Sequence, residues 1–268
     1  MEKVRPLKKF GQNYLQDQNI LNKIADEINP QPEDHVVEIG PGTGALTEKL
    51  INKAGKMTAV EIDKRVIENL QCRFPTLYLI SNDFLEVDLN SINSENKKLR
   101  VVGNIPYYLT SSILFKLIGN NDIVEDAILM TQLEVAQRIT AKRGTKAYGI
   151  LAVLLQFFCD VKLCFKVSPN VFYPKPKVFS AVIHLTFKEV DLSGTTKQIF
   201  ISVVKAAFGN RRKTLKNSLS NSIFAKLNFE KSGIDLRLRA EQLSLADFLT
   251  LARFASCELN NRQNISDK

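Results

Sequence analysis

Between residues 35 and 131 the chain repeats one pattern, in which a short apolar segment is followed by an amphipathic one. The apolar segments are rich in Val, Ile, Leu and Met, as is typical of strands that are buried on both faces. Such alternation predicts a parallel sheet covered by helices on both faces. The expected strands are His35–Ile39, Met57–Ile62, Leu77–Ser81, Arg100–Asn104 and Ala127–Thr131, and the expected helices are Asp17–Ile28, Gly44–Lys53, Lys64–Phe74, Ser111–Ile118 and Gln132–Arg143.

The pattern changes after residue 147. Tyr148–Cys159 predicts a buried helix, and Val161–Val167 and Ala181–Phe187 predict two further strands. These two strands can pair antiparallel at the sheet edge, because no second long crossover helix separates them. Glu189–Thr196 has the composition of a linker, and the residues after it have a helical pattern. We therefore expect an α/β domain over residues 1–190 and a small all-helical domain over residues 191–268.

The positive charge is concentrated near the C-terminus. The net charge is +9, from 37 Lys and Arg against 28 Asp and Glu. Residues 197–268 hold 13 of these cations and 6 of the anions, a balance of +7, which leaves +2 for residues 1–196. This asymmetry favours an acidic polymer as partner, most simply nucleic acid, although a solvated basic surface also explains it.

The composition is that of an ordinary water-soluble protein, with 44% hydrophobic and 24% charged residues. The longest apolar run, Ile150–Cys159, is too short to span a bilayer, and the N-terminus lacks the apolar stretch of a secretory signal. The four cysteines show no Cys-x-x-Cys spacing, which argues against a zinc site or a disulfide framework. We expect a cytoplasmic protein with no metal and no membrane partner.

A glycine-rich turn, Gly40-Pro41-Gly42-Thr43-Gly44, follows the first expected strand and opens a helix. Glycine permits positive φ at such a turn and lets a ligand approach the main chain closely. Glu61 ends the next strand, with Ile62 after it, and its carboxylate can accept hydrogen bonds from both hydroxyls of a ribose. The turn therefore predicts a cofactor that contains a nucleoside. Because Ala45 completes a dinucleotide fingerprint, NAD is a serious alternative at this point.

Two details favour S-adenosylmethionine over NAD. Glu38 lies two residues before Gly40, where a carboxylate would repel a pyrophosphate but not a sulfonium or an ammonium group. Asp83 and Phe84 follow the third expected strand. Asp83 can accept from the exocyclic amine of an adenine while Phe84 packs on the ring, although an aspartate there can also be a cap.

The tetrapeptide Asn104-Ile105-Pro106-Tyr107 follows the fourth expected strand. An aromatic amine is a poor nucleophile because its lone pair is delocalised into the ring. The side-chain carbonyl of Asn104 and the main-chain carbonyl of Ile105 can accept its N–H groups and localise that lone pair for attack on a methyl sulfonium. Pro106 stiffens the turn and Tyr107 offers a ring face for stacking. This chemistry needs positioning and directed dipoles rather than a general base.

Two further segments have the composition of RNA contacts. Phe172 precedes a stiff loop with Pro174, Lys175, Pro176 and Lys177, so that Phe172 can stack on a target base and the lysines can contact phosphate. Near the C-terminus, four cations fall within two turns of an expected helix, where a solvated helix face is the alternative explanation. These cations are Arg211, Arg212, Lys213 and Lys216.

Taken together, these motifs resemble those of the bacterial 16S ribosomal RNA adenine dimethyltransferases over nearly the whole chain. Gly11-Gln12-Asn13-Tyr14-Leu15 is similar to the N-terminal cofactor motif of that family, with Tyr14 where Phe or His is usual. The resemblance implies that the cofactor-binding residues are Gln12, Asn13, Leu15, Glu38, Gly40, Gly42, Glu61, Ile62, Asp83, Phe84 and Asn104, and that the catalytic ones are Asn104, Ile105, Pro106, Tyr107 and Phe172.

The resemblance further implies a Rossmann-like class I methyltransferase sheet, mostly parallel with an antiparallel last strand, and a helical RNA-binding domain. It implies that two methyl groups pass from S-adenosylmethionine to N6 of each of two adjacent adenosines near the 3′ end of 16S ribosomal RNA. The implied partner is an assembling small ribosomal subunit, and we expect the protein to act as a monomer. Methyltransferases of 23S ribosomal RNA share the cofactor and catalytic motifs, but the Tyr173–Lys177 and Arg211–Leu215 segments favour the small-subunit enzymes.

Overall fold

The computed structural model describes residues 6–7, 10–93 and 97–266, and the chain divides into two compact units. Met1–Gln137 and Cys159–Lys188 form the sheet unit, and Arg138–Phe158 and Glu189–Lys268 form the helical unit. The sequence places one boundary at residue 190, close to the division observed after Lys188. It does not anticipate that residues 138–158 leave the first unit and join the second.

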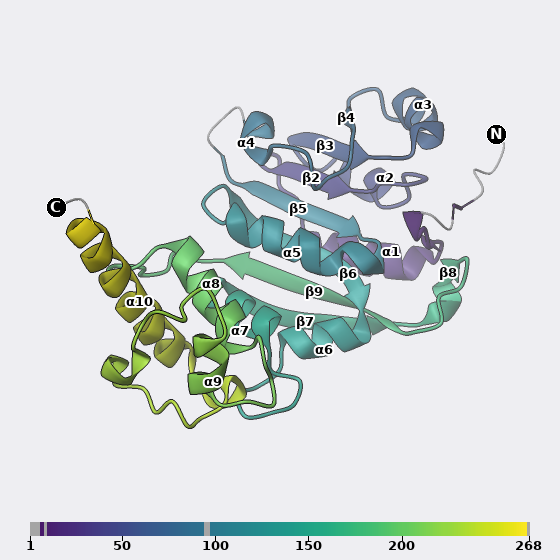
Figure 1. Ribbon diagram of the computed structural model, residues 1–268. Coiled ribbons are helices and arrows are strands. Elements are labelled where there is room, and N and C mark those ends of the chain that lie inside the picture. The colour runs from purple at the N-terminus through teal and green to yellow at the C-terminus, as the bar shows by residue number, and fades with distance from the viewer. Residues whose placement is uncertain (1–5, 8–9, 94–96, 267–268) are drawn as a thin grey trace. The chain divides into compact units, whose positions relative to one another are not determined.

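A seven-stranded sheet forms the centre of the sheet unit (Figure 1), with the strand order β4-β3-β2-β5-β6-β9-β7. The first five strands in this order are parallel, whereas β9 runs antiparallel to both β6 and β7. The mostly parallel sheet and its antiparallel end are therefore as predicted. The strands are β2 (His35–Ile39), β3 (Lys56–Glu61), β4 (Tyr78–Ser81), β5 (Leu99–Asn104), β6 (Val124–Gln132), β7 (Cys159–Val167) and β9 (Ser180–Phe187).

Helices cover the sheet because their apolar residues recur on one side of each. The buried face of α1 (Gln18–Ile28) shares a hydrophobic core with residues of α2 (Thr47–Leu50), α3 (Lys64–Arg73) and the sheet. In Figure 1, α5 (Thr110–Gly119) crosses in front of the sheet and α1 lies behind it. The other helices at this unit are α4 (Leu89–Ile92) and α6 (Leu133–Ile139).

The helix expected over Gly44–Lys53 is much shorter in the structure. Gly44 has a φ of +79°, which a right-handed helix cannot contain, so the regular helix begins only at Thr47. By contrast, α1 and α3 begin where expected, because the side chains of Asp17 and Asp63 accept hydrogen bonds from main-chain N–H groups of the first turn.

A second, two-stranded sheet was not predicted. The strands β1 (Tyr14–Leu15) and β8 (Phe172–Tyr173) pair antiparallel, with Tyr14 opposite Tyr173 and Leu15 opposite Phe172. Residues that face each other in such a pair lie on the same side of the ribbon, and successive residues alternate. Leu15 and Phe172 are accordingly only 7% and 5% exposed, whereas Tyr173 is 59% exposed.

The helical unit is built around aromatic side chains. It contains α7 (Ile150–Phe158), α8 (Lys197–Ala207), α9 (Leu215–Ser220) and α10 (Leu245–Ser266). Phe157 of α7 stacks on Phe200 of α8 at a centroid distance of 4.1 Å, and Phe208 stacks on Phe248 of α10 at 5.8 Å. None of the helices in the described part of the chain combines the length and the apolar character that a membrane crossing requires.

Within the sheet unit, two carboxylates contact the side chain of His184 in β9. Its Nε2 lies 3.0 Å from Oδ2 of Asp126, and its Nδ1 lies 2.9 Å from Oε1 of Glu27. Arg100 also donates to Asp126, and Lys162 donates to Glu27. The hydrogen bond with Asp126, followed by the one with Glu27, raises the pKa of His184 above its usual value, against the opposing effect of burial.

This pKa shift predicts a specific pH dependence of stability. Because the folded-state pKa is raised, protonated His184 stabilises the fold fully below its unfolded pKa of about 6.5, and the contribution is lost as pH rises through the folded pKa. His184→Gln should therefore lower Tm most near pH 6 and progressively less toward pH 9, as measured by thermal unfolding across that range. A Tm difference that stays constant with pH would contradict a protonated His184.

Candidate active site

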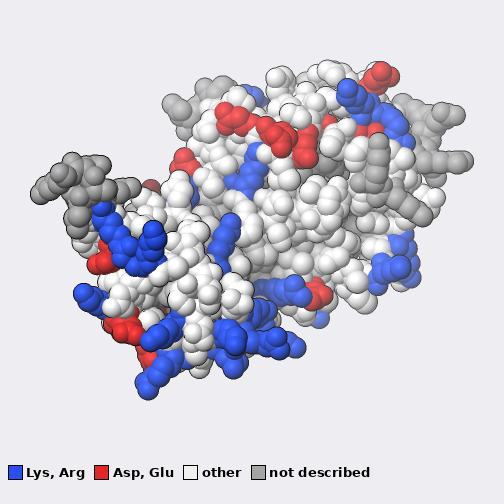
Figure 2. Space-filling view, in the orientation of Figure 1, with Lys and Arg blue, Asp and Glu red and all other residues white. Residues whose placement is uncertain are grey.

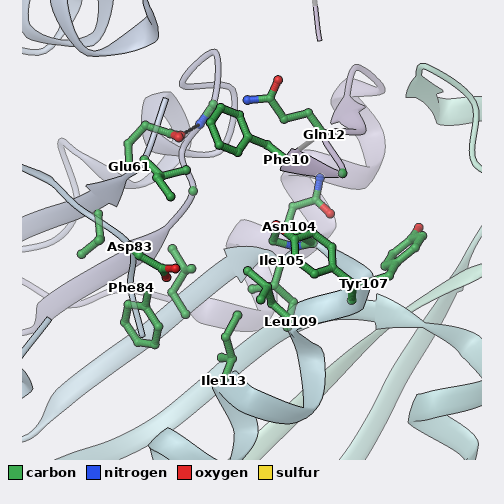
Figure 3. A pocket seen from close by; sticks show the side chains of 18 of the residues that line it. Phe10, Gln12, Glu61, Asp83, Phe84, Asn104, Ile105, Tyr107, Leu109 and Ile113 are labelled. Carbon is green, nitrogen blue, oxygen red and sulfur yellow. Dashed lines mark hydrogen bonds between the residues drawn. The ribbon is translucent and has the colours of Figure 1, made fainter. Parts of the chain in front are cut away.

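An open cavity lies in the sheet unit where β2, β3 and β5 end. Ligands of open α/β sheets bind at this carboxyl edge. In Figure 3, Glu61, Asp83 and Phe84 lie along one side of the cavity, and Asn104 and Tyr107 lie along the other. The wall brings together most of the predicted residues, namely Gln12, Asn13, Gly40, Gly42, Glu61, Ile62, Asp83, Phe84, Asn104, Ile105, Pro106 and Tyr107.

Glu61 holds the glycine turn against the end of β3. Its Oε2 accepts from the N–H of Gly42 at 3.0 Å, and its Oε1 accepts from the N–H of Asp63 at 2.8 Å. Burial raises the pKa of this carboxyl group. Gly40 and Gly42 have φ values of +61° and +54°, as expected for residues that let a ligand approach the main chain. Each carboxylate oxygen has two lone pairs, so Glu61 can still accept from ligand hydroxyls.

Glu38 is buried and does not line the main cavity, so its predicted contact with the cofactor stays a prediction. It lines a second cavity with Leu15, and its Oε2 accepts from the Thr47 hydroxyl at 2.6 Å. Burial raises the pKa of Glu38 to about 7. The group is therefore only partly ionised at neutral pH, and the charge argument against a pyrophosphate is weaker than the sequence alone suggested.

The N-terminal motif forms the upper part of the wall. Gln12 accepts from the N–H of Leu7 at 2.7 Å and donates from Nε2 to Oδ2 of Asp63 at 3.0 Å. A hydrogen bond from Arg65 lowers the pKa of Asp63 to about 2, so that Asp63 remains an acceptor for Gln12. These bonds attach the segment before β1 to the loop after β3. Gln12 therefore stabilises the cavity wall in addition to its predicted contact with the cofactor.

Lys116 supports the Asp83–Phe84 loop, a role that the sequence analysis missed. From α5 its Nζ donates to the carbonyls of Leu85 at 2.8 Å and Val87 at 2.5 Å. The same Nζ lies 5.5 Å from the centroid of the Phe84 ring. The only signal in the sequence is that Lys116 is the one charged residue of α5. Asp83 accepts from the N–H of Leu85 and points toward the cavity in Figure 3.

Asn104 is fixed in one orientation. Its Nδ2 donates to the main-chain carbonyl of Asn13 at 2.8 Å. A carbonyl can only accept, so this contact fixes which end of the amide is the NH₂ group and leaves Oδ1 as the free acceptor. Tyr107 is fixed as well, because its hydroxyl lies 2.6 Å from Oγ of Ser180 at the start of β9. The Asn104 oxygen and the Tyr107 ring are thus pre-positioned at the same wall.

Phe172 and Leu15 are not brought into the main cavity. Both belong to the hydrophobic core, since the alternation along β8 and β1 turns them inward. The stacking of Phe172 on a substrate base therefore has no support in this arrangement. The predicted contact of Leu15 with the cofactor is likewise unsupported by the wall of the main cavity. Ile62, in contrast, is partly exposed at that cavity.

The predicted RNA-binding cations differ in how they are engaged. Within the helical unit, Arg211 donates from Nη2 to the carbonyls of Lys146 at 2.5 Å and Tyr148 at 3.1 Å. Lys216 pairs with Glu230 at 2.8 Å. Arg212 and Lys213 are exposed, and no ion pair or side-chain hydrogen bond engages them in the part of the chain that the structure describes. Lys175 and Lys177 are exposed on the sheet unit.

The Arg211 contacts bring a second basic segment beside the first. Lys142, Arg143 and Lys146 lie on the exposed turn that Arg211 holds, and they are not among the RNA-binding residues predicted from the sequence. Figure 2 shows Lys and Arg side chains gathered over the lower part of the helical unit. Their common surface depends on a contact between residues 65 positions apart, which is why the pattern along the chain did not show it.

The seven-stranded sheet, with its antiparallel β9 and a ligand cavity at the carboxyl edge of its parallel strands, defines a class I methyltransferase. A family described as "Ribosomal RNA adenine dimethylase" matches residues 4–256. The chain belongs to this ribosomal RNA adenine dimethylase family. Within the described residues, no group of three His, Cys, Asp or Glu side chains is arranged to hold a metal ion, and the prediction of a metal-free enzyme stays a prediction.

Two curated proteins named "Ribosomal RNA small subunit methyltransferase A" illustrate the similarity. The one from Chlorobium phaeobacteroides is 47% identical over 248 residues, which cover 91% of each chain. The one from Francisella tularensis is 42% identical over 260 residues, 95% of this chain and 99% of the relative.

Two solved structures share the fold over most of both chains. A dimethyladenosine transferase from Plasmodium falciparum superposes with a TM-score of 0.77 at 27% identity, covering 93% of this chain and 98% of that one. The 23S rRNA methyltransferase ErmE superposes with a TM-score of 0.65 at 25% identity, covering 91% and 99%.

Proposed function

We propose that this protein transfers methyl groups from S-adenosylmethionine to N6 of two adjacent adenosines near the 3′ end of 16S ribosomal RNA. The observation that carries the proposal is the orientation of Asn104, whose NH₂ group is held by the carbonyl of Asn13 so that Oδ1 is the free acceptor. The names of the relatives, which are small-subunit ribosomal RNA methyltransferases, support the choice of substrate.

Two features of the cavity fit a bound cofactor. Apart from Gly40 and its two chain neighbours, no atom of the described residues lies within 4 Å of the position that a Cβ on Gly40 would take. The hydroxyl of Tyr14 is buried and has no hydrogen-bond partner among the described residues, and a ligand can satisfy it. We assign Glu61 to the ribose, Asp83 and Phe84 to the adenine, and Gln12, Asn13 and Gly42 to the amino-acid end. When bound, S-adenosylmethionine supplies an electrophilic methyl carbon on a sulfonium.

The chain's own residues prepare the nucleophile. The Asn104 Oδ1 and the Ile105 carbonyl accept the two N–H groups of the adenine amine, which draws the nitrogen lone pair out of conjugation. Pro106 holds the turn and Tyr107, fixed by Ser180, presents a ring to the base. Such directed dipoles act at the moment of reaction without reorganising, and this explains how the site works without a general base.

For RNA binding we assign the exposed cations of the helical unit, Arg212 and Lys213, together with Lys142, Arg143 and Lys146, to the phosphate backbone. Lys175 and Lys177 of the sheet unit are assigned to phosphate next to the cavity. Arg211 acts instead as the residue that holds the 142–148 turn in place. We further propose that the residues after 190 act as an RNA-binding domain, that the partner is an assembling small subunit, and that the protein works as a cytoplasmic monomer.

The different roles assigned to Lys213 and Arg211 give a prediction. Lys213→Ala should weaken RNA binding and reduce the slope of log K against log salt by ~0.7–0.9 for one lost phosphate contact, with an unchanged Tm. Arg211→Ala should instead destabilise the helical unit by about 1 kcal/mol, because two charge-assisted hydrogen bonds are lost. Salt titrations of RNA binding and thermal unfolding of both variants separate the two roles. Equal effects of the two variants on both measurements would contradict the assignment.

The function itself is tested by mass spectrometry of small-subunit RNA. Undermethylated small subunits and, in a parallel reaction, large-subunit RNA are incubated with the protein and labelled S-adenosylmethionine. The small-subunit RNA should gain label as N6,N6-dimethyladenosine at two adjacent positions. Label in large-subunit RNA instead would identify a 23S enzyme. Stable binding to small subunits with no label would identify an assembly factor that has kept the fold.

A further inference from the structure

Three large aromatic rings are exposed on the sheet unit next to the cavity. Tyr108 is 63%, Tyr173 is 59% and Phe179 is 54% exposed. Burying one such ring contributes roughly 1.5–3 kcal/mol, so leaving three of them in water has a cost unless a partner covers them. We call these three residues the aromatic rim.

Each residue of the aromatic rim is attached to the cavity wall. Tyr108 is itself part of the wall, and a Cβ on Gly11 would come within 3.1 Å of its ring. Phe179 directly precedes Ser180, whose hydroxyl binds Tyr107. The main-chain carbonyl of Phe179 accepts from the N–H of Leu133 at 2.9 Å. The rim therefore borders the place that the proposed function gives to the target base.

Tyr173 faces the same side as the wall because of the register of the β1–β8 ribbon. Tyr173 lies opposite Tyr14, and Tyr14 lines the cavity. Residues opposite each other in an antiparallel pair share a face, so Tyr173 projects on the cavity side while Phe172 faces the core. A register shifted by one residue would reverse this arrangement.

The charge around the rim indicates the kind of partner. Lys175 and Lys177 lie between Tyr173 and Phe179 in the sequence and are exposed, and no hydrogen bond or ion pair engages their side chains in the part of the chain that the structure describes. Exposed rings interspersed with free cations are the combination that binds single-stranded nucleic acid, in which bases stack on the rings and phosphates meet the cations.

We propose that the aromatic rim stacks unpaired nucleotides that flank the target adenosine, so that the substrate must be presented as an unstacked, single-stranded segment. This inference rests on the proposed function and extends it from the target base to its neighbours. A rigid duplex keeps its bases stacked on one another and leaves none for the rings. The rim therefore selects RNA by its strandedness, while the cavity selects the base.

The test compares two RNA probes with variants of the full chain. One probe is a short unpaired oligoribonucleotide with two adjacent adenosines, flanked by 2-aminopurine, and the other is the same strand in a perfect duplex. Tyr173→Ala and Phe179→Ala should each weaken binding of the unpaired probe on the order of tenfold, in line with stacking energies of 1–3 kcal/mol per base, and abolish the fluorescence change of 2-aminopurine. Tyr173→Phe, which keeps the ring, should bind like the unaltered protein.

Tyr78 provides the matched control. It is a tyrosine of the same exposure, 63%, on the edge strand β4, and it does not line the cavity. Tyr78→Ala should leave the affinity for both probes unchanged. The proposal is overturned if the rim variants bind the unpaired probe normally, if they lose the same affinity for the duplex, or if Tyr78→Ala is equally impaired.

The outcome for the rim is separate from the outcome for the proposed function. The affinity for S-adenosylhomocysteine and the transfer of label to small-subunit RNA are measured first on the unaltered protein. If the unaltered protein transfers no label but the rim variants still bind the unpaired probe more weakly, the aromatic rim is an RNA-binding surface and the proposed function is wrong. If the unaltered protein transfers label but the rim variants bind the unpaired probe as it does, the proposed function stands and the aromatic rim is not an RNA-binding surface.

Discussion

Asn104→Ala is expected to reduce the rate constant of methyl transfer by about 10²–10³-fold, the loss that follows removal of one directed hydrogen-bonding group from a preorganised site. The substitution deletes the Oδ1 that accepts from the target amine, together with the Nδ2 bond to the carbonyl of Asn13. Because the missing interaction develops as the amine lone pair localises, the loss should be seen in kcat rather than in KM.

Single-turnover transfer with saturating RNA measures this effect, and the affinity for S-adenosylhomocysteine should change by no more than roughly threefold. Asn104→Asp gives a second comparison. It keeps an oxygen toward the amine but places an acceptor against the Asn13 carbonyl, so it too should be slow. Asn90→Ala, an exposed asparagine outside the cavity, controls for the substitution itself. Normal transfer by Asn104→Ala would remove the basis of the proposed mechanism.

Gly40→Ala is expected to lower the affinity for S-adenosylhomocysteine by roughly tenfold to a hundredfold. Gly40 lines the cavity, and beyond its chain neighbours no atom of the described part of the chain lies within 4 Å of the Cβ that an alanine would add, so the methyl enters the space assigned to the ligand. Forcing a methyl into a well-packed contact costs ~1–3 kcal/mol. The φ of +61° adds strain to the folded protein that is independent of any ligand.

Gly144→Ala separates the strain from the obstruction. Gly144 has a φ of +83° and equally open surroundings, but it lies on the basic turn of the helical unit, outside the cavity wall. Both variants should lose about 1–2 kcal/mol of unfolding free energy, whereas only Gly40→Ala should lose ligand affinity by calorimetric titration. Equal ligand affinities in the two variants would show that the glycine turn does not contact the cofactor.

The strands of the parallel sheet could be predicted from the sequence because each is a short segment rich in Val, Ile, Leu or Met, and the cavity followed because parallel strands end at one edge. What could not be predicted depends on contacts between distant residues. The two-residue strands β1 and β8 are too short to show periodicity, and without their register the opposite orientations of Phe172 and Tyr173 are invisible. The register of this ribbon decides which of the two aromatic rings is buried and which is exposed.

The same limit applies to charged and polar side chains. In the sequence, Arg211, Arg212 and Lys213 look like equivalent cations. Among the described residues, only the Arg211 side chain of these three donates to main-chain carbonyls, which lie 65 and 63 residues away in the chain. Glu38 precedes the glycine turn in sequence, yet the strand turns its side chain toward Thr47. No sequence motif marks Lys116, because its partners are two main-chain carbonyls of a loop that is distant in sequence.

The β1–β8 ribbon also has a consequence for the order in which the molecule is made. Residue 14 needs residue 173 as its neighbour, and Tyr107 needs Ser180, so the last pieces of the wall leave the ribosome long after the glycine turn. Nascent chains that end between Tyr107 and Ser180 contain the glycine turn, Asn104 and Tyr107, but they lack the Ser180 hydroxyl that holds Tyr107. Maturation of this enzyme's binding site is therefore a late event of its own synthesis, completed only when β9 can insert between β6 and β7.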